Sequence, residues 1–187
     1  MNLVRIISGA VNALMGKPQD RKWEQDFDLS APALPRSFIA VAAYIPLGMV
    51  VAKAAVKYND NTASVPYGPI AITLGLIALT FPLIAYVLCM VFDKMDRFRP
   101  WVIVRNWTIL IALVLIALVL GLFLVGILPF FPAYVLALTL YIGTLAIDVR
   151  LAWRVAEFDW MGAVFAGILI SVATMMVLSL VISQNIA

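Results

Sequence analysis

Histidine is absent from this 187-residue sequence, cysteine occurs once, and charged residues make up only 12% of the chain. The lack of histidine excludes a His-ligated haem or metal and a His-based catalytic triad. A single cysteine forms neither a disulfide framework nor a cluster for zinc or iron–sulfur. A chain that is 65% hydrophobic also has too little polar surface to cover a water-soluble core. The composition therefore indicates an integral membrane protein without an evident reactive centre.

Long apolar runs dominate the sequence. A bilayer core about 30 Å thick needs roughly 20 apolar residues per helix. Runs of this kind, bounded by charge, lie at 38–56, 70–92, 107–147 and 161–182. The third run is long enough for two helices, and Gly126, Pro129 and Pro132 interrupt it, because proline removes a backbone donor and ends a helix. We therefore expect an all-α, polytopic membrane helix bundle with five transmembrane helices.

The few charges fall almost entirely on one side of this predicted bundle. Eleven of the 13 basic and nine of the 10 acidic residues precede the first span or separate spans two from three and four from five. The positive-inside rule then predicts a cytoplasmic N-terminus and a C-terminus on the opposite side of the membrane. Because the charges nearly balance, we attribute the basic excess to topology and to contact with lipid headgroups, and expect no nucleic acid partner.

The N-terminal segment has apolar residues at helical spacing along one face, namely Leu3, Ile7, Val11, Leu14 and Met15. It is too short and too polar to span a membrane, and Lys17 and Pro18 end it. The pattern predicts an interfacial amphipathic helix lying on the cytoplasmic leaflet, with a lid packed against the bundle as the alternative. We divide the chain into a cytoplasmic segment with this helix, residues 1–36, and a five-helix transmembrane domain, residues 37–187.

The polar segment 20–35 contains four acidic residues but no spacing typical of a calcium loop, so we interpret it as a solvated loop rather than a metal site. Asp28 or Ser30 is expected to cap a short helix there. Pro32 and Pro35 are expected to give the chain an extended entry into the first span.

The other two charged segments place aromatic residues beside arginines, a pattern typical of anchors at a membrane edge. Residues 148–160 put Arg154 and Glu157 at i,i+3 spacing, as in a helix crossing the headgroup zone or in a docking surface. Asn106, at the mouth of the third span, is expected to bond a neighbouring segment such as the Asp28 loop. The candidate cytoplasmic interaction residues are Trp23, Asp28, Arg36, Arg99, Trp101, Arg105, Asn106, Trp153 and Arg154.

Inside the predicted spans, Lys53 is the only charge, near the outer end where it can reach the headgroups. Proton relays and carboxylate-coupled transport need ionisable groups at depth, and this assignment offers none. Pro46 and Pro82 are candidate kinks that face one another. The candidate helix-packing residues of the last span are Gly162, Ala163, Ala166 and Gly167, small enough to admit another helix of this chain or of a partner.

Catalysis is not expected from these residues. Intramembrane serine, aspartyl and zinc proteases need a base, two buried aspartates or an H-E-x-x-H motif. Asp93 and Asp96 lack the glycine and the further aspartates of a lipid phosphotransferase. Cys89 has no histidine partner and is interpreted as an inert buried thiol. We expect no enzyme, no cofactor and no metal.

Three stretches of the sequence are familiar in combination. They are Phe27-Asp28-Leu29-Ser30 with Arg36-Ser37-Phe38, then residues 97–107, and then Trp153-Arg154-Val155-Ala156 leading to Gly162-Ala163. Together they resemble a family of uncharacterised five-helix inner-membrane proteins of alphaproteobacteria. The segment 28–32 and the five spans are also similar to Yip1-type membrane proteins. These resemblances imply a fold and a multi-pass location in the bacterial inner (cytoplasmic) membrane, with the N-terminus cytoplasmic and the C-terminus periplasmic, but no activity.

The sequence thus predicts a non-catalytic membrane protein that acts through its cytoplasmic face as an accessory, assembly or membrane-organising subunit. The expected partners are the lipid bilayer and other membrane protein subunits or further copies of the chain. The alternative is a small oligomeric transporter or channel for a lipid or neutral solute, built around Pro46 and Pro82. A further possibility is a membrane-shaping protein that works through the N-terminal helix.

Overall fold

The computed structural model describes residues 3–16, 20–58 and 67–185. Within them the chain is helical and has no strand. The helices are α1 Leu3–Met15, α2 Trp23–Asp26, α3 Ala33–Ala42, α4 Tyr44–Tyr58, α5 Tyr67–Val91, α6 Met95–Leu124, α7 Phe130–Arg154 and α8 Trp160–Asn185. Five segments are long and apolar enough to cross a membrane: α3 with α4, α5, α6, α7 and residues 160–177 of α8. The predicted all-α membrane helix bundle is confirmed.

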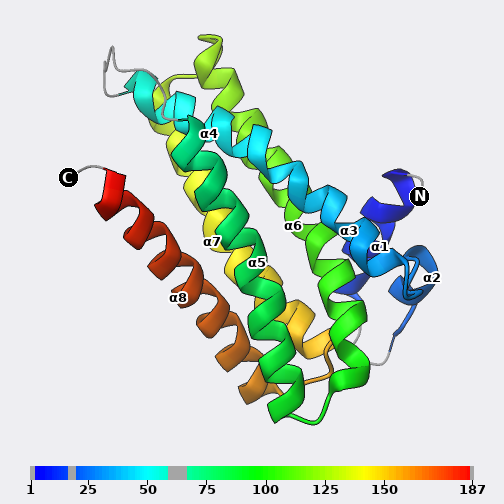
Figure 1. The fold of residues 1–187 in the computed structure, drawn as a ribbon. Coiled ribbons are helices and arrows are strands. Elements are labelled where there is room, and N and C mark those ends of the chain that lie inside the picture. The colour runs from blue at the N-terminus through cyan, green and yellow to red at the C-terminus, as the bar shows by residue number, and fades with distance from the viewer. Residues whose placement is uncertain (1–2, 17–19, 59–66, 186–187) are drawn as a thin grey trace.

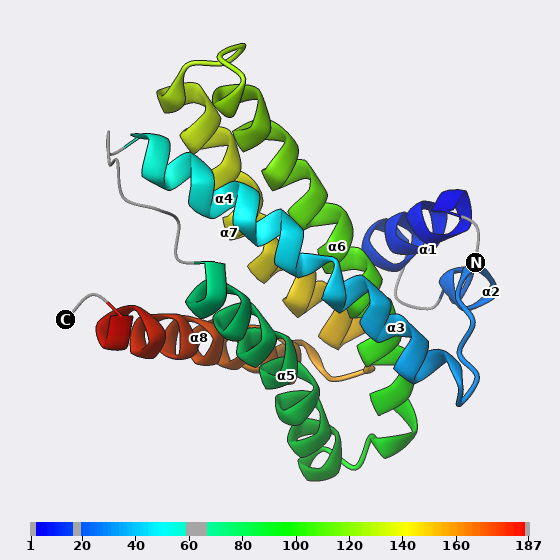
Figure 2. The same ribbon diagram turned by 45° about the horizontal axis from the view of Figure 1, so that its top comes forward.

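Helix α6 is the centre of the arrangement, because it packs against α3, α4, α5, α7 and α1. Figure 1 shows α6 running beside α7, with the α3–α4 pair across it. Helices α5 and α8 lie side by side in Figure 2, and they join the rest of the bundle because α8 packs on α7 and α5 packs on α4 and α6. The connections α5–α6 and α7–α8 lie at the same end of the bundle as the polar contacts of α2, and we call this the charged end.

Helices α6 and α7 are longer than the apolar run 107–147 that predicted them. Helix α6 begins at Met95 and α7 continues to Arg154. Arg105 and Asp148 therefore lie within membrane-spanning helices, and the expectation that Lys53 is the only charge in a span is wrong. The helices continue past the apolar run because their charged side chains pair with other parts of the chain, which removes the cost of leaving them unsolvated.

The entry into the first span is helical rather than extended. Pro32 has helical backbone angles (φ −71°, ψ −13°) and Pro35 lies in the first turn of α3. Proline is tolerated there because the first N–H groups of a helix have no intrahelical partner. The same rule explains Pro46, which lies in the first turn of α4 just after the break at Ala43. Pro82, in contrast, lies inside the uninterrupted helix α5.

The segment 148–160 is not one helix. Helix α7 ends at Arg154, and Glu157 adopts a left-handed backbone conformation (φ 56°) that no α-helix continues. The expected i,i+3 pair between Arg154 and Glu157 is replaced by contacts of both residues with the N-terminal segment.

The small residues of α8 pack inside the bundle. Ala163 and Ala166 are fully buried, and a Cβ atom on Gly167 would lie 3.2 Å from the backbone nitrogen of Val149 in α7. Gly162 is also buried, next to Asp159 and the ring of Phe92. Of the two alternatives for these residues, contact with another helix of this chain is the one observed.

Candidate functional site

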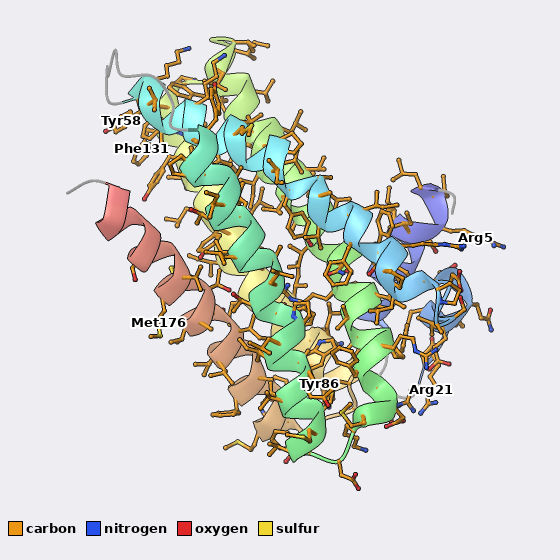
Figure 3. The ribbon with its side chains drawn as sticks, viewed as in Figure 1. Arg5, Arg21, Tyr58, Tyr86, Phe131 and Met176 are labelled. Atoms are coloured by element: carbon orange, nitrogen blue, oxygen red, sulfur yellow. The ribbon has the colours of Figure 1, made fainter. Side chains whose placement is uncertain are left out.

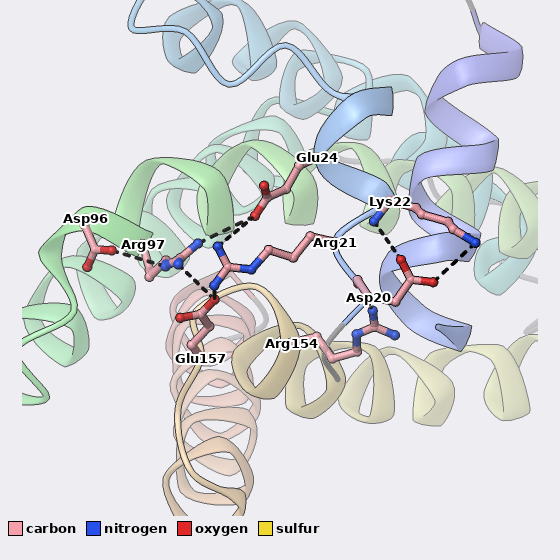
Figure 4. Close-up of polar contacts among 8 residues, drawn as sticks. All are labelled: Asp20, Arg21, Lys22, Glu24, Asp96, Arg97, Arg154 and Glu157. Carbon is pink, nitrogen blue, oxygen red and sulfur yellow. Dashed lines mark hydrogen bonds and ion pairs between the residues drawn. The ribbon is translucent and has the colours of Figure 1, made fainter. Parts of the chain in front are cut away.

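The charged end is held together by four ionised side chains: Arg21, Glu24, Arg97 and Glu157. Arg97, at the start of α6, bonds Glu157 with its Nη2 atom at 2.9 Å and lies 3.7 Å from Glu24. Arg21 donates to the same Glu157 oxygen and lies 3.8 Å from Glu24. Figure 4 shows the four side chains converging from α2, the residues just before α2, α6 and the α7–α8 connection. We call this group the ionic clamp.

Two further arginines bind the chain just after α1. Arg150 donates from Nε to the carbonyl of Leu14 at 2.8 Å and from Nη2 to that of Gly16 at 3.3 Å. Arg154, which is 3% exposed, donates to the carbonyl of Asp20 at 2.7 Å. Cations are favoured here because the last carbonyls of a helix are unpaired and carry partial negative charge. The N-terminal segment is thus fastened to the end of α7 as well as to α6.

Gly16 permits this close approach. A Cβ atom at Gly16 would lie 2.7 Å from the Nη1 atom of Arg154. Any larger residue at position 16 would push the guanidinium away from the end of α1. The absence of a side chain at position 16 leaves the space that the guanidinium of Arg154 occupies.

A layer of polar side chains lies inside the bundle, further from the charged end. Arg105 of α6 binds Asp148 of α7 with two hydrogen bonds, Nε to Oδ1 at 2.6 Å and Nη2 to Oδ2 at 3.0 Å. Both side chains are nearly buried, with exposed fractions of 12% and 5%. The guanidinium of Arg105 also lies over the ring of Phe81, 3.9 Å from its centroid.

The break between α3 and α4 is bonded to α6 at the same level. Tyr44 donates its hydroxyl to the backbone carbonyl of Asn106 at 2.9 Å, and Asn106 donates from Nδ2 to Ser37 Oγ at 2.9 Å. Ser37 in turn donates to the carbonyl of Leu34. Each of the buried side chains of Ser37 and Asn106 therefore has a hydrogen-bond partner within the protein.

The nine candidate interaction residues divide by exposure. Trp23, Trp101, Asn106 and Arg154 are each no more than 3% exposed and serve the interior. Arg105 is paired with Asp148, and Trp153 packs edge-on against Trp160 with ring centroids 5.7 Å apart. The three that lie exposed on the surface are Asp28, Arg36 and Arg99.

Asp28 and Asn106 do not meet. Asn106 bonds Ser37, whereas Asp28 accepts the backbone N–H of Ser30 at 3.0 Å. Hydrogen bonds from the hydroxyl and the N–H of Ser30 lower the pKa of Asp28. This is a turn before the helix and not a cap of it, since α3 begins after Pro32, where no side chain caps the backbone.

The acidic residues of segment 20–28 each have a different partner. Asp20 contacts Lys22, Glu24 contacts the two arginines of the ionic clamp, and Asp26 accepts a hydrogen bond from Asn12 at 2.9 Å. Among the described residues no three His, Cys, Asp or Glu side chains group as metal ligands. The acidic segment joins helices to one another.

Family models, curated proteins and solved structures were compared with the chain, and none matches. The functional interpretation therefore rests on the residues themselves.

One pattern in the sequence indicates the contact between Arg105 and Asp148, although the composition does not. Arg105 and Asp148 flank the uncharged stretch 107–147 at almost equal distances from its ends. A helical hairpin over that stretch brings its two open ends together, so opposite charges there face each other. Glu157 and Arg97 carried no comparable signal, because their contact depends on the left-handed turn after α7.

Proposed function

We propose that the protein is a non-catalytic accessory, assembly or membrane-organising subunit of a bacterial inner membrane, acting through the charged end on the cytoplasmic side. The observation that supports this most is the fastening of residues 14–16 and 20–26 to the bundle by the ionic clamp together with Arg150 and Arg154. A segment held at this many points is a formed surface rather than a loose tail.

A formed surface suits a docking role. Binding a partner costs entropy for every side chain and loop that becomes ordered, and a segment that is already ordered avoids much of that cost. Asp28, Arg36 and Arg99 are exposed on the protein. Exposed charges of both signs select partners by electrostatic complementarity and accelerate encounter. The other expected partners, further membrane subunits or copies of this chain, fit the same arrangement.

Site-specific photocrosslinking in native membranes tests the proposal. A photoreactive residue is placed at Arg36 or Arg99 and, as matched controls, at Ile127 and Phe131, which are exposed beside the α6–α7 connection at the other end. We expect one discrete crosslinked species from Arg36 or Arg99, weakened by Asp28→Ala, and none of that mass from the controls. Identical products from both ends, or none from Arg36 and Arg99, would overturn the proposal.

One observation favours the alternative of a small transporter for a lipid. An apolar groove of about 180 Å³ lies between α5 and α8, lined by Leu83, Ile84, Val87 and Leu169, and it begins directly after Pro82. A proline inside a helix frees a backbone carbonyl and weakens the helix there. If this alternative holds, reconstituted protein accelerates the exchange of labelled lipid between leaflets, and Leu169→Trp, which fills the groove, abolishes the exchange.

A further inference from the structure

Helix α1 has three chemically different faces. At 3.6 residues per turn, neighbouring residues are about 100° apart around the axis, which sorts its side chains into three adjoining strips. The strip buried against the protein contains Ile6, Gly9, Ala10 and Ala13. A polar strip contains Arg5, Ser8 and Asn12. The third strip, the apolar stripe, contains Leu3, Ile7, Val11 and Met15, which are 45–81% exposed.

The buried strip fixes the rotation of α1 about its axis. A Cβ atom at Gly9 would lie 2.6 Å from the ring of Phe27, so only glycine lets α1 and the residue after α2 come this close. Asn12, on the polar strip, donates to Asp26 at 2.9 Å. Rotation in either direction breaks one of these contacts. These contacts therefore hold the apolar stripe of α1 on the side that faces away from the protein.

The end of α1 is fixed as well. Arg150 holds the carbonyls of Leu14 and Gly16, and Arg150 belongs to α7, one of the spans. Helix α1 packs on α6 and α7, and both ribbon views place it on the outer side of them, beside α2 (Figures 1 and 2). Arg5 points away from the bundle (Figure 3). The helix thus lies on the outside of the bundle, beside the charged end and next to α6 and α7, which are long and apolar enough to cross a membrane.

We propose that the apolar stripe of α1 is a membrane-binding surface, and that its occupant is the lipid of the leaflet at the charged end. A helix in the angle between a helix bundle and a bilayer meets protein on one side, lipid on the second and water on the third, and α1 has one matching strip for each. If a partner protein covered the apolar stripe, α1 would not need a polar strip directly beside it. This goes beyond the proposed function, which concerns a protein partner of the exposed charges.

The fixed attachment gives the surface a specific consequence. Most amphipathic helices bind membranes as they fold and can leave again. Here the attachment of α1 through Arg150 and Asp26 holds the apolar stripe at one depth and in one leaflet. Each copy therefore adds volume to the headgroup region of a single leaflet and not to the other.

Depth measurements on the full-length protein test this inference. Cys89 is replaced by alanine, and single cysteines are introduced at Ile7, at Val11 and, as the matched polar-strip control, at Arg5. Each is labelled with an environment-sensitive fluorophore after reconstitution in phosphatidylethanolamine and phosphatidylglycerol vesicles that contain spin-labelled lipid quenchers. We expect the probes at 7 and 11 to be blue-shifted, quenched by lipid and placed roughly 5–10 Å below the headgroups, whereas the probe at 5 is quenched by aqueous iodide.

Two outcomes would overturn the inference. Iodide quenching at all three positions would mean that the stripe faces water. Protection of positions 7 and 11 from both iodide and lipid quenchers would mean that protein, such as a second copy of the chain, covers the stripe. Size-exclusion profiles matching that of the Cys89→Ala parent show that each labelled variant is folded, so the outcomes are not confused with misfolding.

Discussion

Arg105 and Asp148 form a two-point ion pair between α6 and α7, two helices that are long and apolar enough to cross a membrane. Arg105 lies ten residues into α6, about 15 Å along the helix axis at 1.5 Å per residue. Because both side chains are nearly buried, water hydrates neither charge well, and each is stabilised by the other. The pair joins the two helices of the long hairpin and sets their register.

Removing one member of this pair is expected to be costly. Arg105→Leu leaves Asp148 buried without its cation and should lower the free energy of unfolding by about 3–5 kcal/mol. Thermal or denaturant-induced unfolding of the detergent-solubilised protein, followed by circular dichroism, measures the change. The double variant Arg105→Leu/Asp148→Leu, in which no charge remains, is expected to regain most of the loss. A double variant less stable than either single one contradicts this account.

Gly167 and Gly143 form a matched pair of glycine positions. A methyl group at Gly167 meets the backbone of Val149 at 3.2–3.3 Å, whereas at Gly143 it meets nothing within 4 Å. Gly167→Ala should therefore force α7 and α8 apart and cost about 1–3 kcal/mol. Gly143→Ala should be neutral or stabilise the helix by up to about 1 kcal/mol. The melting temperatures of the two variants measure these effects. Equal changes in melting temperature would show that contact with Val149 does not explain the glycine at position 167.

Glu157 combines a strained backbone with two ionic contacts. Its φ of 56° is unfavourable for a residue with a Cβ atom, and its carboxylate binds Arg21 and Arg97. We expect Glu157→Ala to speed amide hydrogen exchange in α2, because the ionic clamp is lost. Glu157→Gly loses the same contacts but relieves the backbone, so it should be the more stable of the two variants, by about 1–2 kcal/mol. Exchange in α2 as slow as in the parent would show that the clamp does not hold the segment.

Asp28 provides a dependence on pH. Hydrogen bonds from Ser30 lower its pKa from the ordinary value of 3.8. A carboxyl group with a lowered pKa stabilises the folded state above its unfolded pKa, and this contribution disappears as the pH falls through the folded pKa. The melting temperature of the parent should thus exceed that of Asp28→Ala near neutral pH, by a small margin because Asp28 is exposed, and the difference should shrink as the pH falls below 3.8 and vanish below the lowered pKa of the folded state. A difference in melting temperature that persists at still lower pH would show that it does not come from the ionised Asp28.

Asn106 and Asp28 are expected to separate a structural role from a functional one. Asn106→Ala leaves the hydroxyl of Ser37 without its donor inside the bundle and should reduce protein abundance in membranes, by a free energy of about 1 kcal/mol. Asp28→Ala should leave abundance unchanged and weaken the crosslink formed from Arg36 or Arg99. Quantitative immunoblotting and the crosslinking experiment measure the two effects. If both variants leave abundance and crosslinking unchanged, the charged end has no such role.

The spans, the break between the third and fourth of them, and the stripe of α1 could be predicted from local sequence patterns. Each span needs only a sufficient run of apolar residues, and the break at Gly126 and Pro129 needs only the conformational limits of those residues. The stripe of α1 was likewise visible from its spacing. Helix ends were predicted less well: α6 begins 12 residues before position 107, because Arg97 and Arg105 pair with Glu157 and Asp148 of other segments, which offsets part of the cost of continuing the helix past the apolar run.

The sequence by itself determined that the chain is a five-helix membrane protein with its charge concentrated at one end, since hydropathy and helical spacing are properties of single segments. Only the tertiary structure decided which charges meet. Arg105 finds Asp148, Glu157 finds Arg21 and Arg97, and Asn106 finds Ser37 because helix packing brings residues far apart in the chain to the same level. It also decided that α1 has both a protein face and an exposed apolar face. Periodicity shows that a helix has a stripe, but packing determines what the stripe faces.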